Sequence, residues 1–246
     1  MRKLEKGPAP EVLRTNEATW TQAYVAAPKE ERRKCEKWRH SAIKDALHEE
    51  TDFKCAYCEA KIIDVSFPHV EHILPKATFP HLAHSWSNLT TACGVCNNGK
   101  GDYYEENAPI LNPYTDELPT FIQHRGPFVD WTAGNVRAEI SVRTLDLNRP
   151  PLLMSRTERI NNVRELYDKW HGSIEPLRSI LAAAIRIDAL KGEFQQTVIT
   201  YLRDRNFSNL IINQNRHRSP RKSGRTTLAS KACPTTVDRE SAKGCP

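Results

Sequence analysis

The chain has 246 residues, of which 36 are Lys or Arg and 30 are Asp or Glu, so its formal net charge is +6. Apolar residues make up 39% and charged residues 27%, a balance typical of globular proteins and incompatible with disorder over most of the length. The longest apolar stretch, residues 180–185, is too short to span a bilayer, and the first residues lack the apolar segment of a secretion signal, so we expect a cytoplasmic protein.

The first 52 residues are expected to form an N-terminal helical segment. Pro8 and Pro10 make its start irregular, whereas residues 29–50 are rich in helix-forming side chains. Within that stretch five apolar residues recur at intervals of three or four, which predicts one amphipathic helix: Trp38, Ala42, Ile43, Ala46 and Leu47.

Residues 53–107 contain two C-x-x-C pairs, Cys55 with Cys58 and Cys93 with Cys96, separated by 34 residues. Both thiolates of such a pair can point at one ion, and two pairs complete the tetrahedron of sulfur ligands that Zn²⁺ favours. Because four sulfurs leave no position for water, the zinc is expected to be structural. Two alternatives fit less well. A disulfide framework conflicts with the odd total of seven cysteines, and a thioredoxin-like redox site needs only one pair.

The segments between and after these pairs carry residues suited to phosphodiester hydrolysis. They are the stretches VEHILPK (70–76) and NNGKGD (97–102). Neutral histidine is the usual base that deprotonates water near pH 7, and carboxylate and amide oxygens hold hard divalent cations. Glu71 and His72 would point to opposite faces of a regular strand, so the site needs both faces or a local irregularity. Asn97 directly follows the last of these cysteines, so zinc binding would fix its position.

Residues 108–213 are expected to hold a β-hairpin followed by helices. Strict alternation of apolar residues from Val136 to Val142, after the turn signal Gly134-Asn135, predicts the hairpin. The chain breaks at residues 148–151, and Gly172 fits the end of the first helix beyond. These helices carry apolar stripes, which we interpret as core, with a docking surface for a partner as the alternative. The three stripes are Ile160, Val163, Tyr167 and Trp170; Leu177, Leu181 and Ile185; and Phe194, Val198, Tyr201 and Leu202.

The positive charge is confined to the end of the chain. Residues 1–213 contain 28 basic and 28 acidic side chains, whereas residues 214–246 contain 8 basic and 2 acidic ones. The composition of that tail predicts disorder, either as an arm that attracts nucleic acid or as a solvated terminus without a specific role. Affinity of the body for nucleic acid must then come from a bound metal, from a partner, or from lysines around the site: Lys54, Lys61, Lys76 and Lys100.

Taken in this order, the motifs resemble the HNH endonuclease family, whose ββα-metal core is often supported by a four-cysteine zinc. The resemblance is carried by residues 54–58 (KCAYC), 70–76 (VEHILPK), 86–89 (WSNL) and 93–100 (CGVCNNGK). It implies an α+β fold in which an HNH core with a structural zinc is flanked by N-terminal and C-terminal helices.

The resemblance also implies roles for individual residues. His72 would be the general base that activates water, and Glu71 and Asn97 would hold a catalytic divalent cation, Mg²⁺ or Mn²⁺. Asn88 matches the residue that braces the loop and the base, and Lys100 matches a basic position near the substrate phosphate. The pattern is His-Asn-Asn here, and Glu71 stands where Asp is more frequent, so a nearby histidine is an alternative ligand: His69, His81 or His84.

Outer segments are similar to the HNH proteins of Septu and retron anti-phage systems, over about residues 1–205. They include residues 1–4, 110–114 (ILNPY) and 144–149 (TLDLNR). The similarity implies an ABC-type ATPase partner that restrains the nuclease and, for a retron member, a reverse transcriptase with its non-coding DNA–RNA complex. The C-terminal helical stripes would then be the docking surface for the ATPase.

Three hypotheses follow. The chain is a metal-dependent endonuclease and toxic effector of phage defence, a zinc-stabilised non-catalytic nucleic-acid-binding or adaptor protein, or a stand-alone restriction-type or homing-type nuclease. The first is favoured because a pure scaffold needs only the cysteines, whereas Glu71, His72, Asn88 and Asn97 are all present. DNA is the favoured substrate, with RNA as the alternative.

Overall fold

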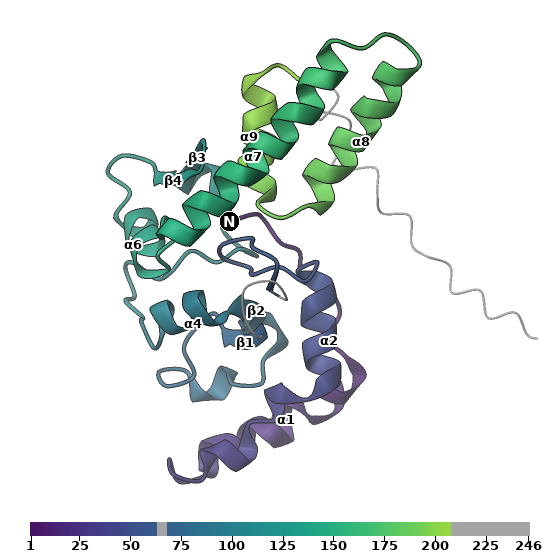
Figure 1. Ribbon diagram of the computed structural model, residues 1–246. Helices are drawn as coiled ribbons and strands as arrows, with labels where there is room; N and C mark the ends of the chain where they lie inside the picture. The colour runs from purple at the N-terminus through teal and green to yellow at the C-terminus, as the bar shows by residue number, and fades with distance from the viewer. Residues whose placement is uncertain (63–67, 208–246) are drawn as a thin grey trace, which may run out of the picture. The chain divides into compact units, whose positions relative to one another are not determined.

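The computed structural model describes residues 1–62 and 68–207, which form a mixed helical and β structure (Figure 1). The predicted α+β class is therefore confirmed. Two antiparallel sheets of two strands each occur in this part of the chain: β1 (Pro68–His72) with β2 (Leu89–Cys93), and β3 (Ile122–Arg125) with β4 (Phe128–Trp131). The α-helices are α1 (Glu11–Ala26), α2 (Ser41–Glu50), α4 (Gly94–Lys100), α5 (Leu118–Phe121), α6 (Val136–Thr144), α7 (Pro150–His171), α8 (Leu177–Lys191) and α9 (Gln195–Asp204).

The N-terminal segment is helical, but the prediction of one helix over residues 29–50 is wrong in its first half. Two short 3-10 turns, η1 (Arg32–Cys35) and η2 (Lys37–Arg39), precede α2. Helix α2 begins at Ser41 because the side chain of His40 accepts a hydrogen bond from the Ala42 N–H and caps it. Trp38 lies in η2 and is buried, as expected.

Helix α1 is not among the predicted elements, because the two prolines before it indicate an irregular start. Pro10 occupies the N-cap position, where its fixed φ does no harm, and Glu11 lies in the first turn, where a negative charge is favourable. Helices α1 and α2 pack with β2 around one apolar cluster that includes Leu13, Ile43 and Leu89. This cluster supports the sheet that carries the candidate site.

Strands β1 and β2 lead directly into α4 and form a compact ββα unit (Figure 1). The register places Pro68 opposite Cys93 and His72 opposite Leu89. The sulfur of Cys93 accepts a hydrogen bond from the Cys96 N–H, so the cysteine that ends β2 also caps α4. Two further 3-10 turns, η3 (Pro80–Leu82) and η4 (Trp86–Asn88), lie in the connection between the strands.

The hairpin predicted from the turn signal Gly134-Asn135 and the alternation over residues 136–142 is wrong in position. The observed hairpin is β3–β4, which turns at Gly126 with a φ of 58°. Residues 136–144 are instead helical, because Asn135 caps α6 by accepting a hydrogen bond from the Ala138 N–H at 3.0 Å. Ala138 and Val142, four residues apart, face the core, whereas Val136 is 63% exposed. The apolar alternation in the sequence was therefore not a strand period.

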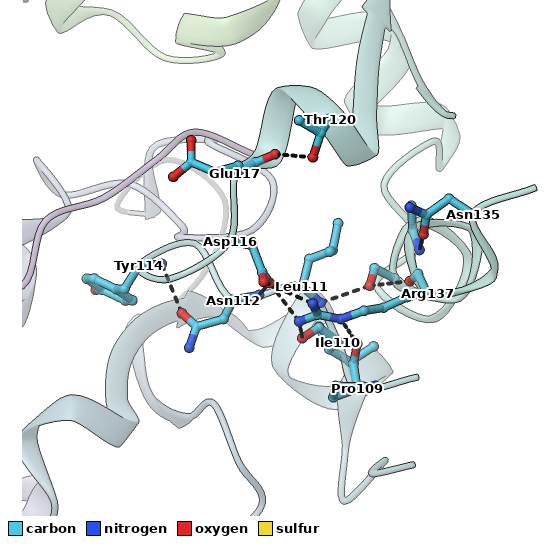
Figure 2. A network of polar contacts seen from close by, with 12 residues as sticks. Pro109, Ile110, Leu111, Asn112, Tyr114, Asp116, Glu117, Thr120, Asn135 and Arg137 are labelled. Carbon is cyan, nitrogen blue, oxygen red and sulfur yellow. Dashed lines mark hydrogen bonds and ion pairs between the residues drawn. The ribbon is translucent and has the colours of Figure 1, made fainter. Parts of the chain in front are cut away.

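The ILNPY segment forms a turn held by an arginine from α6 (Figure 2). Arg137 makes a bidentate ion pair with Asp116, at 2.6 and 2.9 Å, and donates from Nε to the Pro109 carbonyl. Asp116 in turn accepts a hydrogen bond from the Asn112 N–H, and Asn112 accepts one from the Tyr114 N–H. This network fixes the Tyr114 ring, whose hydroxyl is hydrogen-bonded to Thr90 on β2 at 2.8 Å.

Helices α7, α8 and α9 pack side by side around their own apolar cluster (Figure 1). The stripe predicted on α7 packs in this cluster, and α7 ends at Gly172 as expected. On α8 the buried face is Ala182, Ile185 and Ala189, whereas Leu177 is 52% exposed and does not belong to the core. The core interpretation therefore holds for the stripes on α7 and α9 and for Ile185, whereas Leu177 and the half-buried Leu181 lie outside the cluster.

In the described ranges, no helix combines the length and apolar character that crossing a membrane requires. The predicted disordered tail, residues 214–246, lies outside the described residues. The predicted boundaries between the segments of the chain, at residues 52, 107 and 213, stay a prediction.

Candidate active site and metal centre

Four cysteine sulfurs meet in the interior of the ββα unit. Their Sγ atoms all lie within 4.8 Å of one another, and each cysteine is at most 1% exposed. Cys55 and Cys58 come from the turn before β1, Cys93 ends β2, and Cys96 lies in the first turn of α4. The disulfide interpretation fails, because all four are free thiols and Cys58 and Cys93 are 3.9 Å apart, about twice a disulfide bond length.

This donor set fits a tetrahedral zinc ion. Four thiol sulfurs at such separations can all reach one cation, and burial excludes a water ligand. Within the cluster, hydrogen bonds from neighbouring thiols lower the pKa of Cys93, whereas burial raises the pKa of Cys55. The cysteine cluster could therefore hold zinc, with its role in the structure rather than in the reaction.

A cleft of about 440 Å³ opens beside this centre. It is lined by residues of β1 and α4, and by residues of η2 and α2 from the N-terminal segment. The lining includes four of the five predicted catalytic residues, Glu71, His72, Asn97 and Lys100, together with His69. Segments separated by up to about 60 positions in the sequence thus converge on one cavity.

His72 is the last residue of β1 and is 5% exposed. Its Nε2 atom is 2.9 Å from the carbonyl oxygen of Ala83. A carbonyl only accepts hydrogen bonds, so the ring proton is assigned to Nε2, and Nδ1 is left as the basic nitrogen. The Trp38 ring lies perpendicular to the imidazole and fixes its plane, with ring centres 4.8 Å apart at 90°. Burial lowers the pKa of His72 to about 3, which keeps the ring neutral.

Glu71 lies one position earlier, and its partners come from α4 and from the first cysteine pair. Its Oε1 atom is 2.7 Å from Lys100 Nζ and accepts a hydrogen bond from the Tyr57 hydroxyl at 3.3 Å. Burial raises the pKa of Glu71, while Lys100 and Tyr57 act in the opposite direction. Both contacts made within the described part of the chain involve Oε1, so Oε2 remains as the oxygen that could face a cation.

Lys100 is only 3% exposed, and its ammonium group is occupied. Besides Glu71, it donates to the backbone carbonyl of His72 at 2.8 Å. One lysine therefore holds both consecutive residues of β1 in place. The predicted role of Lys100 at the substrate phosphate stays a prediction, and its observed contacts are those of a residue that positions its neighbours.

Asn97 is the first residue after the last cysteine, and its side chain lies against His69. The two side-chain nitrogens, Asn97 Nδ2 and His69 Nδ1, are 2.9 Å apart, so the amide donates and its oxygen is left free to bind a cation. His69 is two positions before Glu71, so both lie on the same face of β1. Of the three histidines considered as alternative ligands, His69 lines the cleft. His84 is instead fully buried beside Cys35, and His81 is exposed on η3.

Asn88 lies behind the cleft and holds the connection between the strands. Its side chain accepts from the Leu74 N–H at 2.7 Å and donates to the carbonyls of Leu74 and Leu82, at 3.0 and 3.3 Å. The next residue in this loop is Ala83, whose carbonyl accepts from His72. Asn88 thus acts on the histidine through the loop and does not reach the cleft itself.

The basic residues near the cleft differ from those expected. Lys76 lines it, as predicted, whereas Lys54 is buried and Lys61 lies outside the lining. Arg39 and Lys44 also line the cleft, which no local pattern predicted, because they come from the N-terminal segment. The same holds for Trp38, which contacts His72 through the tertiary fold.

Comparison with known proteins identifies the segment that carries this geometry. Residues 55–103 match the family described as HNH endonuclease. The chain is 34% identical over 138 residues to Septu protein PtuB of Bacillus thuringiensis, across 53% of this chain and 52% of that protein. It is 25% identical over 154 residues to Septu protein PtuB of Bacillus mycoides (strain KBAB4), across 50% of this chain and 52% of that protein.

The chain spans about half the length of the curated relatives it matches. Both matches agree with the resemblance inferred from the motifs, which is thereby confirmed. Residues 55–103 thus match the HNH endonuclease family and carry a four-cysteine cluster, in a chain that is similar to Septu PtuB.

Proposed function

We propose that this protein is a metal-dependent endonuclease that hydrolyses phosphodiester bonds in nucleic acid. The proposal rests mainly on His72, a neutral histidine whose Nε2 proton is held by the Ala83 carbonyl and which lines a cleft with a carboxylate and an amide. A general base for water must be neutral, fixed in orientation and close to the reacting atoms. A residue kept only for packing would not require a cleft beside it.

In the proposed reaction His72 accepts the proton of the attacking water at Nδ1, and the Ala83 carbonyl stabilises the imidazolium through Nε2. The side-chain oxygens of Glu71 and Asn97 would hold the divalent ion, Mg²⁺ or Mn²⁺. A cation bound there supplies charge neutralisation at the phosphate and at the leaving 3′ oxygen. By family resemblance the product carries a 5′ phosphate.

A cation bound between Glu71 and Asn97 would have two kinds of oxygen ligand, one from a carboxylate and one from an amide. Glu71 would offer Oε2 while Oε1 stays with Lys100, and Asn97 would offer its amide oxygen while Nδ2 stays with His69. His69 is the histidine that could replace Glu71 as a ligand, but only if its Nδ1 atom is released from Asn97. Because Tyr57 lies between the first two cysteines and contacts Glu71, zinc binding would also help to place the carboxylate.

The substrate is proposed to be held through its phosphates. Arg39, Lys44 and Lys76 line the cleft, and such side chains contact the sugar–phosphate backbone without reading its sequence. DNA is the favoured substrate, and RNA is the alternative. Replacing each of the three by Gln should lower affinity for both nucleic acids and reduce its salt dependence.

The proposed biological role is that of an effector in anti-phage defence, regulated by an ABC-type ATPase. The likeness to Septu PtuB supports this role. A retron reverse transcriptase with its DNA–RNA complex is the partner that the wider resemblance adds. Most of the predicted stripes are buried, so any contact of an ATPase with these helices would involve exposed apolar residues such as Ile180 and Ile187.

The alternatives are a non-catalytic binding or adaptor protein and a stand-alone nuclease. Wild-type protein and the variant His72→Ala should be compared on supercoiled DNA and on RNA, with Mg²⁺ or Mn²⁺, with and without an ATPase encoded beside the gene. We expect His72→Ala to cleave about 100-fold to 10,000-fold more slowly than wild type, the usual contribution of a general base.

The matched control is His81→Ala, an exposed histidine nearby, which should cleave at the wild-type rate. Zinc content and thermal unfolding of both variants report whether the fold is intact. Equal cleavage by His72→Ala and wild type would overturn the catalytic assignment. An inactive wild-type protein that still binds nucleic acid would favour the adaptor, and full activity and regulation without any ATPase would favour the stand-alone nuclease.

A further inference from the structure

An arginine from outside the HNH domain reaches the cysteine cluster. Arg149 is the last residue of the TLDLNR motif and the N-cap residue of α7. Its Nη1 atom is 3.6 Å from the sulfur of Cys96, and its Nη2 atom is 3.9 Å from that of Cys58 and 3.8 Å from that of Cys93. One guanidinium group therefore contacts three of the four sulfurs.

The guanidinium is also fixed by its own turn. Nη1 donates to the carbonyls of Leu145 and Asp146, at 3.3 and 3.0 Å. Leu145 is fully buried, and the turn is closed by a hydrogen bond from the Leu147 N–H to the Val142 carbonyl. Arg149 is thus anchored at the backbone and directed at the sulfurs, in a manner that a mobile surface arginine would not show.

The negative charge of the metal-bound thiolates explains why a nearby guanidinium group would be stabilising. Four thiolates and one Zn²⁺ carry about two net negative charges, and burying them away from water is costly unless they are compensated. The fork of a guanidinium can donate to several sulfurs at once, which the point charge of lysine cannot do. Arg156, two turns further along α7, is 1% exposed and places a second positive charge in the same region.

We propose that Arg149 is the charge-compensating residue of the metal centre and that it couples metal retention to the packing of α7. It donates N–H···S hydrogen bonds to Cys58, Cys93 and Cys96, and it reaches them only when the 144–149 turn and the start of α7 are in place. Displacement of α7 therefore weakens zinc binding, and loss of zinc removes an attachment point of α7. This role rests on zinc at the four cysteines and not on nuclease activity.

The test measures zinc affinity in the full chain by competition with a chromogenic chelator. Three variants are compared with wild type: Arg149→Gln, Arg149→Lys, and the control Arg164→Gln, which removes an exposed arginine from the same helix. We expect Arg149→Gln to bind zinc 10-fold to 100-fold more weakly, the usual effect of removing a group that hydrogen-bonds to metal ligands. Arg149→Lys should lie between Arg149→Gln and wild type, and the control should match wild type.

A second measurement separates contact with the sulfurs from a merely structural role. In the Co²⁺-substituted protein, loss of N–H···S bonds makes the thiolates better electron donors, so the sulfur-to-cobalt charge-transfer band of Arg149→Gln should move to longer wavelength. If that variant does not fold, Arg149→Lys serves for both measurements.

Zinc affinity within twofold of wild type together with an unshifted band would overturn the proposal. A wild-type chain that binds neither zinc nor cobalt would also overturn it, whether or not the chain cleaves nucleic acid. Conversely, loss of cleavage in His72→Ala with normal zinc affinity bears only on the nuclease, so the two proposals fail separately.

Discussion

The HNH domain and the α7–α9 cluster are both well packed, but they bury different kinds of side chain. Around the cleft the buried set includes Glu71, His72, Asn88 and Lys100, and each of them has a hydrogen-bond partner or ion-pair partner. In the helical cluster the buried set is mainly aliphatic and aromatic. Paired polar groups specify one geometry, whereas apolar volume can often be repacked. Substitutions of the polar residues around the cleft should therefore alter chemistry, and those in the helical cluster should alter stability.

The largest effect is expected for Cys93→Ser. This change removes a metal ligand, although the serine hydroxyl can still cap α4, and the free energy of metal binding is part of the free energy of folding. We expect loss of bound zinc and a decrease in unfolding free energy of more than about 5 kcal/mol, measured by metal analysis and denaturant unfolding. Undiminished zinc content and stability would show that the cysteine cluster does not hold the domain together.

Ile185→Ala provides the contrasting case. Ile185 is 1% exposed in the cluster of α7, α8 and α9, and truncating it leaves a cavity that costs about 3 kcal/mol of unfolding free energy. Zinc stoichiometry and the cleavage rate of the folded protein should remain at wild-type values. A variant that lost zinc or activity while still folded would mean that the two regions are not separate in the way described.

A smaller effect is expected at the border of the regions, where His124 on β3 contacts Thr197 on α9 at 2.9 Å. Burial, with the Met1 ammonium group, lowers the pKa of His124 to about 3. The unfolded chain, with an ordinary pKa near 6.5, therefore takes up a proton that the folded chain does not, so stability falls as the pH decreases from about 7 towards 3.

For His124 alone this linkage amounts to about 2 kcal/mol between pH 8 and pH 5. His124→Gln retains a hydrogen-bonding side chain but cannot titrate, so its stability should depend less on pH by that amount. Denaturant unfolding at both pH values measures the difference, and the remaining dependence on pH is shared with the other buried histidines. Identical pH dependence in variant and wild type would show that His124 is not held neutral.

The cysteine pairs and the order of the HNH motif were predictable, because ligand spacing within a few residues is a local property. Spacing did not distinguish helix from strand over residues 136–142, where the cap at Asn135 determined the outcome. Contacts across the fold were not predictable from local patterns. Trp38 reaches His72 from η2, and Arg149 lies 91 positions from Cys58. One sequence provides no signal for such pairs, because they depend on how separate elements pack.

The register of β1 against β2 has a consequence for how the chain length can vary. Successive side chains of a strand alternate between its faces, so inserting or deleting one residue in β1 ahead of Glu71 would exchange the faces on which Glu71 and His72 lie. The carboxylate would then lie beside Trp38, and the imidazole would lie beside Lys100. The geometry of the active site therefore depends on whether the number of inserted or deleted residues is odd or even. An odd change in length within residues 68–72 should therefore abolish function.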